Sequence, residues 1–132
     1  MCKHFGREAL NPYLFRMTFS LLLLSHWLGD FAFQSSDMAL GKCHSMKWLL
    51  YHVGTYTAIL LVFCLFLLPL SDVAIYVGAN AVLHLITDYF TSRWAQKHRK
   101  VPRKFFPIIG LDQLIHTLTL YWTLEYLPEL PF

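Results

Sequence analysis

Residues 73–94 read VAIYVGANAVLHLITDYFTSRW, an apolar stretch that is interrupted by His84 and Asp88. About 20 apolar residues in a helix, rising 1.5 Å each, cross the hydrocarbon core of a membrane. His84 and Asp88 are about one helical turn apart and therefore share one face of such a helix. Because an ionisable side chain costs roughly 2.5–3.5 kcal/mol in hydrocarbon, the pair predicts a functional site inside a membrane-spanning helix.

Three more stretches of the chain have the same character. The sequence predicts four spanning helices, at about residues 13–33, 46–68, 73–94 and 107–127. Pro69 ends the second, Pro128 follows the fourth, and Pro107 suits the first turn of the fourth. The 132 residues are 56% hydrophobic and only 14% charged, which is too little charge for a soluble domain of this size. We therefore expect an all-α, integral membrane four-helix bundle that forms one domain over residues 1–132.

The net charge and the cysteines exclude several classes of protein. A formal charge of +3 is too small to indicate a nucleic-acid-binding protein. Cys2, Cys43 and Cys64 are odd in number and far apart in sequence. They therefore predict neither a disulfide framework nor a zinc ribbon.

Positive charges gather at one end of the predicted bundle. Lys42 and Lys47 flank the first connection, whereas the second connection has no positive charge. The third connection and its flanks contain Arg93, Lys97, Arg99, Lys100, Arg103 and Lys104. The N-terminal side is only mildly basic, with Lys3, Arg7 and Arg16, and the C-terminal tail carries Glu125 and Glu129. By the positive-inside rule, the first and third connections lie in the cytoplasm and both termini lie outside, as expected in a bacterial inner membrane.

Seven His and Asp side chains are expected to meet at one depth of this bundle. They are His26, Asp30, His52, His84, Asp88, Asp112 and His116. Counted from the cytoplasmic end of each helix, the aspartates lie about 6–8 Å deep and the histidines about 9–13 Å deep. The fourth helix runs opposite to the first and third, and its motif is reversed, DxxxH instead of HxxxD. This reversal keeps the aspartate outermost on all three helices.

Polar stripes and a weak repeat support this arrangement. One stripe follows His26 and Asp30 to Gln34, and a second runs through Asn80, His84, Asp88 and Ser92. SHWLGDF (25–31) resembles LHLITDYF (83–90), and each is followed by a basic connection and by a helix with one more histidine. The repeat predicts two helical hairpins that face each other across a shared site.

Imidazole and carboxylate without thiolate favour a divalent transition metal, zinc above all, rather than copper(I). Seven donors are more than one tetrahedral zinc ion needs and are about right for a dinuclear site, with two ions about 3.5–4 Å apart. We therefore expect the protein to carry one or two ions. Two divalent ions, three aspartates and one bridging hydroxide would be electrically neutral. Without a metal, the same residues predict a proton relay or a hydrogen-bonded cluster that joins the helices.

The chain resembles a family of small multi-spanning bacterial and phage proteins that is known only as a domain of unknown function. The resemblance rests on HWLGDFAFQ, Lys42, LLYHVGTY, LHLITDY with Arg93, and LDQLIHTLTL, and covers nearly all of residues 20–120. It implies no activity. More loosely, the HxxxD helices are similar to membrane-bound metal-dependent hydrolases, which is an analogy from spacing alone.

The favoured function is a metal-dependent hydrolase near the cytoplasmic leaflet, acting on a membrane lipid or isoprenoid phosphate. All seven His and Asp residues are expected to bind metal, and Asp30, Asp88 and Asp112 to be catalytic. Gln34, Lys42, Arg93 and Gln113 are expected to bind the substrate, and the basic segment KHRKVPRK (97–104) to attract its head group.

Two alternatives use the same residues. A metal-ion or proton transporter needs a polar path to the far side, whereas Leu21–Leu24 and most of residues 57–68 are apolar. A non-catalytic membrane protein would use the metal to hold short helices together, as a homo-oligomer or with a membrane partner.

Overall fold

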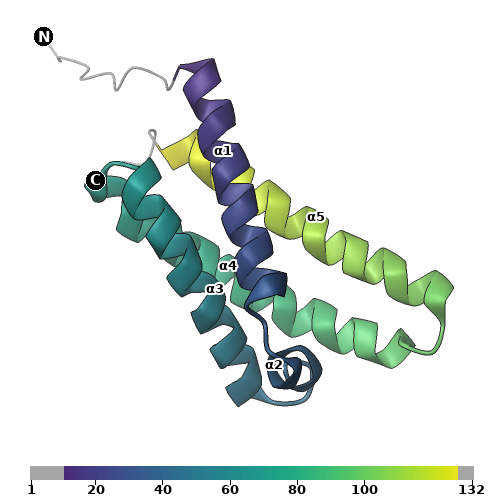
Figure 1. Ribbon diagram of the computed structural model, residues 1–132. Helices are drawn as coiled ribbons and strands as arrows, with labels where there is room; N and C mark the ends of the chain where they lie inside the picture. The colour runs from purple at the N-terminus through teal and green to yellow at the C-terminus, as the bar shows by residue number, and fades with distance from the viewer. Residues whose placement is uncertain (1–10, 128–132) are drawn as a thin grey trace, which may run out of the picture.

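The computed structural model describes residues 11–127, which fold entirely into helices and connections (Figure 1). The elements are α1 (Pro12–Trp27), the π-helix η1 (Leu28–Ala32), α2 (Ser36–Gly41), α3 (Met46–Leu67), α4 (Leu70–His98) and α5 (Pro102–Tyr126). The predicted all-α class is thus confirmed. Five residues used in the sequence interpretation, Cys2, Lys3, Arg7, Pro128 and Glu129, lie outside the described residues.

The four long helices pack in a closed order. α3 packs between α1 and α4, and α5 packs against both α4 and α1. The short helix α2 lies beside α3, at the end where the chain turns from α1 into α3 (Figure 1). Each long helix therefore presents one face to a common interior.

Two helices, α3 and α4, are long and apolar enough to cross a membrane, judged by length and composition alone. α1 ends after 16 residues, where the π-helix begins. α5 is longer, but Asp112, Gln113 and His116 lie within it and reduce its hydropathy. The predicted count of four spans therefore stays a prediction.

Several helix boundaries differ from those predicted. α3 matches the predicted range 46–68 closely, but α4 extends beyond the predicted range 73–94 at both ends. The predicted start of the last helix at Pro107 was wrong, because Pro102 takes the first helical position and Pro107 lies inside the helix. The helix α2 was not predicted; the side chain of Ser35 caps it by accepting a hydrogen bond from the N–H of Met38 at 3.2 Å.

A π-helical turn replaces the predicted end of the first helix. The prediction of a regular α-helix to residue 33 was wrong, because the N–H of Phe33 donates to the carbonyl of Leu28, five residues back, at 2.9 Å. Gly29 in this turn lies directly against α3, where an added Cβ would be 3.0 Å from the Cα of Tyr56. Such turns often occur at functional sites, and this one contains buried Asp30.

We expect Gly29→Ala to lower the free energy of unfolding by about 1–3 kcal/mol, because the methyl group would press on the backbone of α3. Gly54→Ala is the matched control, since a Cβ at Gly54 meets no atom within 4 Å. That control should be neutral or stabilising by roughly 0.5–1 kcal/mol, as usual for a helical glycine. Denaturant unfolding in detergent measures both, and equal stability of the two variants would refute the close-packing argument.

The interior of the bundle is divided into two halves. The half nearest the α3–α4 connection is a buried apolar cluster of Leu22, Tyr56, Leu60, Cys64, Val73, Tyr76, Val77, Leu120, Leu124 and Leu127. The half nearest α2 and the α4–α5 connection contains the four buried histidines together with Asp30, Asp88 and Asp112, whereas buried Asp72 lies at the other end, in the first turn of α4. The buried histidines are therefore gathered at one end of the bundle, whereas the other half contains scattered buried polar side chains, such as Thr18 and Asn80.

Candidate metal centre

The structure brings all seven His and Asp residues into one buried cluster. α1 and η1 supply His26 and Asp30, and α3 supplies His52. α4 supplies His84 and Asp88, and α5 supplies Asp112 and His116. Each of the seven residues is at most 6% exposed. Residues from opposite ends of the chain thus form a single group that is closed to solvent.

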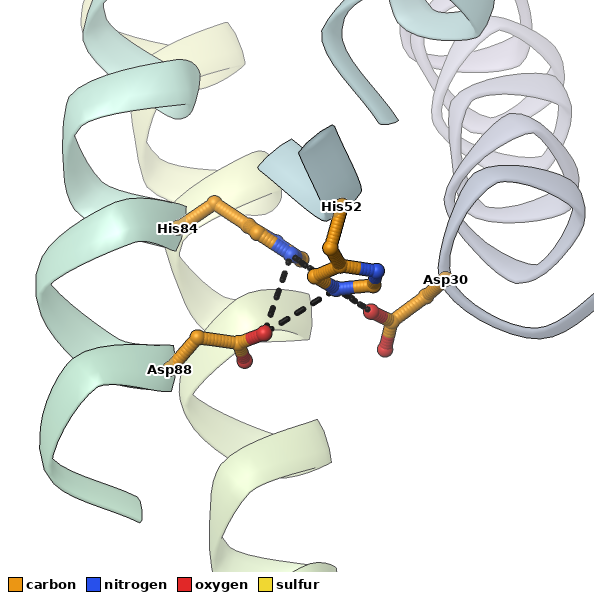
Figure 2. Close-up of side chains that lie close together, drawn as sticks. All are labelled: Asp30, His52, His84 and Asp88. Carbon is orange, nitrogen blue, oxygen red and sulfur yellow. Dashed lines mark hydrogen bonds and ion pairs between the residues drawn. The ribbon is translucent and has the colours of Figure 1, made fainter. Parts of the chain in front are cut away.

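Four of these residues form a compact group of donor atoms, Asp30, His52, His84 and Asp88 (Figure 2). The Nε2 atom of His52 lies 3.0 Å from Oδ1 of Asp30 and 3.0 Å from Oδ2 of Asp88. The Nε2 atom of His84 lies 3.4 Å and 3.7 Å from the same two oxygens. The two Nε2 atoms are 3.2 Å apart. We call these four residues the first donor group.

The spacing of the first donor group fits a tetrahedral ion. A zinc ion about 2.0–2.2 Å from four tetrahedral ligands leaves the ligand atoms about 3.3–3.6 Å from one another. The five distances above run from 3.0 to 3.7 Å, on both sides of that range. The group can therefore hold a divalent ion with only small side-chain movements.

A second donor group lies beside the first and consists of Asp30, Asp112 and His116. The Nε2 atom of His116 lies 3.5 Å from Oδ1 of Asp112 and 3.2 Å from Oδ1 of Asp88. Asp88 therefore directs one oxygen to His116 and the other to the first donor group. Asp30 belongs to both groups. Two adjacent donor groups are thus connected by two carboxylates.

His26 and Gln113 lie at the edge of the cluster. Nε2 of His26 is 3.7 Å from Asp30 and 3.1 Å from Oε1 of Gln113, and His26 belongs to neither donor group. The Gln113 amide donates to Asp30 at 2.8 Å and to Asp112 at 3.0 Å. Gln113 therefore fixes two carboxylates relative to each other. Gln34 is half-buried, and its Oε1 has no hydrogen-bond partner among the described residues.

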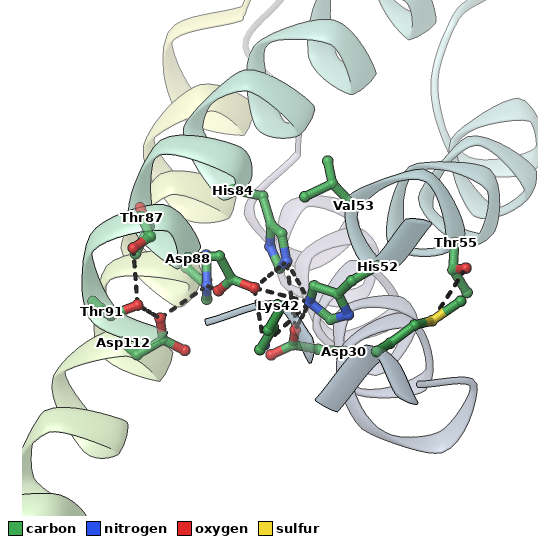
Figure 3. A network of polar contacts seen from close by, with 12 residues as sticks. Asp30, Lys42, His52, Val53, Thr55, His84, Thr87, Asp88, Thr91 and Asp112 are labelled. Carbon is green, nitrogen blue, oxygen red and sulfur yellow. Dashed lines mark hydrogen bonds and ion pairs between the residues drawn. The ribbon is translucent and has the colours of Figure 1, made fainter. Parts of the chain in front are cut away.

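Lys42 lies inside the cluster, although the sequence placed it in a connection as a substrate-binding residue (Figure 3). Its Nζ atom donates to Oδ2 of Asp88 at 2.9 Å and lies 3.4 Å from Nε2 of His52. Burial alone would lower the pKa of Lys42, but the carboxylates of Asp88 and Asp30 outweigh it and raise this pKa. The ammonium is therefore charged, and it lies against two atoms of the first donor group.

Arg93, the other basic residue predicted to bind substrate, does not join the cluster. Its guanidinium lies over the ring of Tyr89, 3.8 Å from the ring centroid, and donates to the Tyr89 carbonyl at 2.8 Å. Arg93 is thus held against its own helix.

Two contributors to the cluster were missed in the sequence. The ring of Tyr56 stacks on His84, with centroids 3.9 Å apart, and His84 stacks on His116 at 4.1 Å. The hydroxyl of Thr91 contacts Oδ1 of Asp112 (Figure 3). Helical spacing could have identified both, because Tyr56 is one turn beyond His52 and Thr91 is about one turn beyond Asp88. The predicted stripe contained Ser92 instead, whose buried hydroxyl has no partner among the described residues.

The imidazoles are oriented by contacts of their Nε2 atoms and by ring packing. The Nδ1 atoms of His26, His52 and His84 are buried without a hydrogen-bond partner among the described residues. Metal-bound histidines usually donate this second N–H to a carboxylate or a carbonyl. Here, the ring of His84 is held by stacking between the rings of Tyr56 and His116 instead.

The family model described as "Protein of unknown function (DUF3307)" matches residues 18–127, so the chain belongs to this family. The resemblance to a domain of unknown function is thereby confirmed. No curated protein and no solved structure matches the chain. The similarity to hydrolases therefore rests on the spacing of His and Asp alone.

Proposed function

We propose that this protein is a membrane-embedded, metal-dependent hydrolase that acts on a lipid or isoprenoid phosphate. The observation that carries the proposal is that Asp30 and Asp88 connect two adjacent groups of metal-ligand type. Adjacent cation sites that share carboxylates are typical of enzymes that hydrolyse phosphate esters. The buried position at one end of the bundle supports a site that is reached from one side only.

The donor chemistry suggests zinc. The donors are imidazole nitrogens and carboxylate oxygens, and neither Cys43 nor Cys64 belongs to the cluster. A bound divalent ion would supply hydroxide at neutral pH and would polarise the phosphoryl oxygen. Asp30, Asp88 and Asp112 would hold the ion with the histidines, and Gln113 would keep two of these carboxylates in place.

We propose that Asp112 is also the proton acceptor, through the carboxylate oxygen that does not bind the ion; Thr91 contacts its Oδ1 and Gln113 donates to its Oδ2. At 6% exposure, Asp112 is the least buried of the seven His and Asp residues. The opening that we propose for the substrate lies at Lys42, whose side chain is 17% exposed, against 1% for its partner Asp88.

The apolar half of the bundle supports an enzyme over a transporter. Leu22, Leu60 and Leu120 are fully buried beyond the cluster. Asn80 is also buried there, but its amide donates within the bundle, to the carbonyl of Tyr76 and to Thr123, both at 2.9 Å. We infer that the Asn80 side chain is structural, because its amide N–H groups donate within the protein, although its Oδ1 atom has no partner among the described residues.

A non-catalytic role for the metal is the second candidate, and the burial of the first donor group favours it. His52, His84 and Asp88 are at most 1% exposed, as expected when a metal holds helices together without an open coordination position. In such a protein the metal would contribute to folding, and the function would belong to an oligomer or a membrane partner.

We propose that the α4–α5 connection lies in the cytoplasm, where its basic residues would contact anionic lipid. A cysteine introduced at exposed Lys100 would then react with an impermeant maleimide only in inverted membrane vesicles. Labelling in intact cells would instead indicate the opposite orientation, with this connection outside the cytoplasm.

The proposed function is tested with detergent-purified protein in mixed micelles. We expect phosphate release from phosphatidic acid or farnesyl diphosphate, loss of that activity after chelation, and recovery when Zn²⁺ is restored. Activity that survives complete removal of metal would contradict the proposal. Zn²⁺-loaded, folded protein that releases no phosphate from either probe would favour the non-catalytic candidate.

A further inference from the structure

Lys42 is a cation that the chain itself places in the metal-ligand cluster. Its ammonium lies 2.9 Å from Oδ2 of Asp88 and 3.4 Å from Nε2 of His52, two of the four donor atoms of the first group (Figure 3). A neutral imidazole nitrogen has one lone pair. An ion bound to this nitrogen of His52 would lie close to the ammonium of Lys42, and the two positive charges would repel each other.

The position of Lys42 is set by packing. It caps α2, where its N–H donates to the carbonyl of Met38 at 3.0 Å. The preceding residue, Gly41, lies against Trp48, so closely that an added Cβ would be 2.4 Å from the indole. The α2 helix is thus held on α3 in a way that directs Lys42 toward Asp88 (Figure 3).

The charge of the cluster changes when Lys42 is included. Asp30, Asp88 and Asp112 contribute three negative charges and Lys42 one positive charge, which leaves an excess of two negative charges. One divalent ion neutralises that excess. With the histidines neutral, two divalent ions would leave the buried cluster with two positive charges, or with one if a hydroxide bridged them, and buried net charge is strongly disfavoured.

The two donor groups also differ in number of ligands. The first has four donors and lies against Lys42, whereas the second has only Asp30, Asp112 and His116. Three protein ligands with one free position are typical of catalytic zinc sites, and four are typical of structural ones.

We propose that Lys42 takes the place of a second metal ion, so that the protein binds one divalent ion, in the Asp30, Asp112 and His116 group. The inference rests on the metal centre of the proposed function. Its consequence is that the ammonium, next to the bound ion, provides the second positive charge for an anionic oxygen of a phosphate substrate. Fixed cations of this kind stabilise transferring phosphoryl groups.

The test is the number of ions bound by wild type and by Lys42→Met, measured by elemental analysis after equilibrium dialysis against buffered Zn²⁺. We expect one ion in the wild type and two in Lys42→Met, because removal of the ammonium frees the first donor group. Lys47→Met is the matched control; Lys47 is exposed and contacts the rings of Trp48 and Tyr51 instead of the cluster. It should bind one ion.

Lys42→Gln covers the case in which Lys42→Met does not fold, since the amide keeps a hydrogen-bond donor without the charge. A Co²⁺ titration provides a second measurement, because the additional ion in the variants should show the strong visible absorption of tetrahedral cobalt. Two ions in the wild type, or one ion in the folded Lys42 variants, would overturn the inference while leaving the hydrolase proposal intact. A wild type that binds no ion would overturn both.

Discussion

Replacing Asp88 by asparagine is expected to lower the affinity for Zn²⁺ at least 10–100-fold, the usual effect of losing a metal ligand or its supporting partner. Asp88 contacts His52, His84 and His116, and it accepts the hydrogen bond from Lys42. The change therefore weakens both donor groups at once. Elemental analysis of the purified variant measures the first effect.

The same variant should also be less stable. Removing one partner of a buried ion pair typically costs about 3–5 kcal/mol, because the remaining charge stays buried. Asp88 is 1% exposed, and the ammonium of Lys42 would lose its closest carboxylate. The double variant Lys42→Met/Asp88→Asn should regain part of that stability, because no unpaired ammonium remains.

Asp37→Asn is the control for the loss of one negative charge, since Asp37 is exposed in the first turn of α2. It should retain both metal and stability. If Asp88→Asn keeps wild-type metal content and stability, then the cluster is not a metal centre in which Asp88 connects two groups.

Much of this cluster could be predicted because helical geometry determines it. The spacing of His84 and Asp88 places both on one face, and the reversed order of Asp112 and His116 suits an antiparallel neighbour. Because these residues lie at similar distances from the same end of the bundle, they meet at one level. The boundaries of α3, which ends just before Pro69, followed from apolar length and one proline.

The parts that could not be predicted depend on contacts between elements. The π-helical turn contains Gly29, which lies against Tyr56 of α3, and no local sequence pattern predicts this contact. Lys42 enters the cluster because α2 folds back on α3, whereas its sequence neighbourhood is typical of a connection. Arg93 was expected to bind substrate, but Tyr89, one turn earlier, offers its ring and its carbonyl.

Replacing Asp112 by asparagine is expected to reduce phosphate release per folded molecule by at least about 100-fold, the lower limit for loss of a general base. Asparagine keeps the shape of the side chain and one carbonyl oxygen, which can accept the hydrogen bond from Gln113. Its amide can donate to the hydroxyl of Thr91, which now contacts the carboxylate. The fold should therefore survive the change.

Activity must be compared per folded molecule and at saturating Zn²⁺, because loss of metal and loss of fold also lower the total rate. Thr91→Val is the matched control; it removes the hydroxyl next to Asp112 but leaves the carboxylate in place. We expect it to keep most of the activity. A structural metal predicts a different pattern, in which Asp112→Asn loses activity only in proportion to lost folded protein. Full specific activity of folded Asp112→Asn at saturating Zn²⁺ would therefore rule out Asp112 as the proton acceptor. If that activity persists at lower Zn²⁺, where the variant binds less metal than the wild type, the centre has no catalytic role.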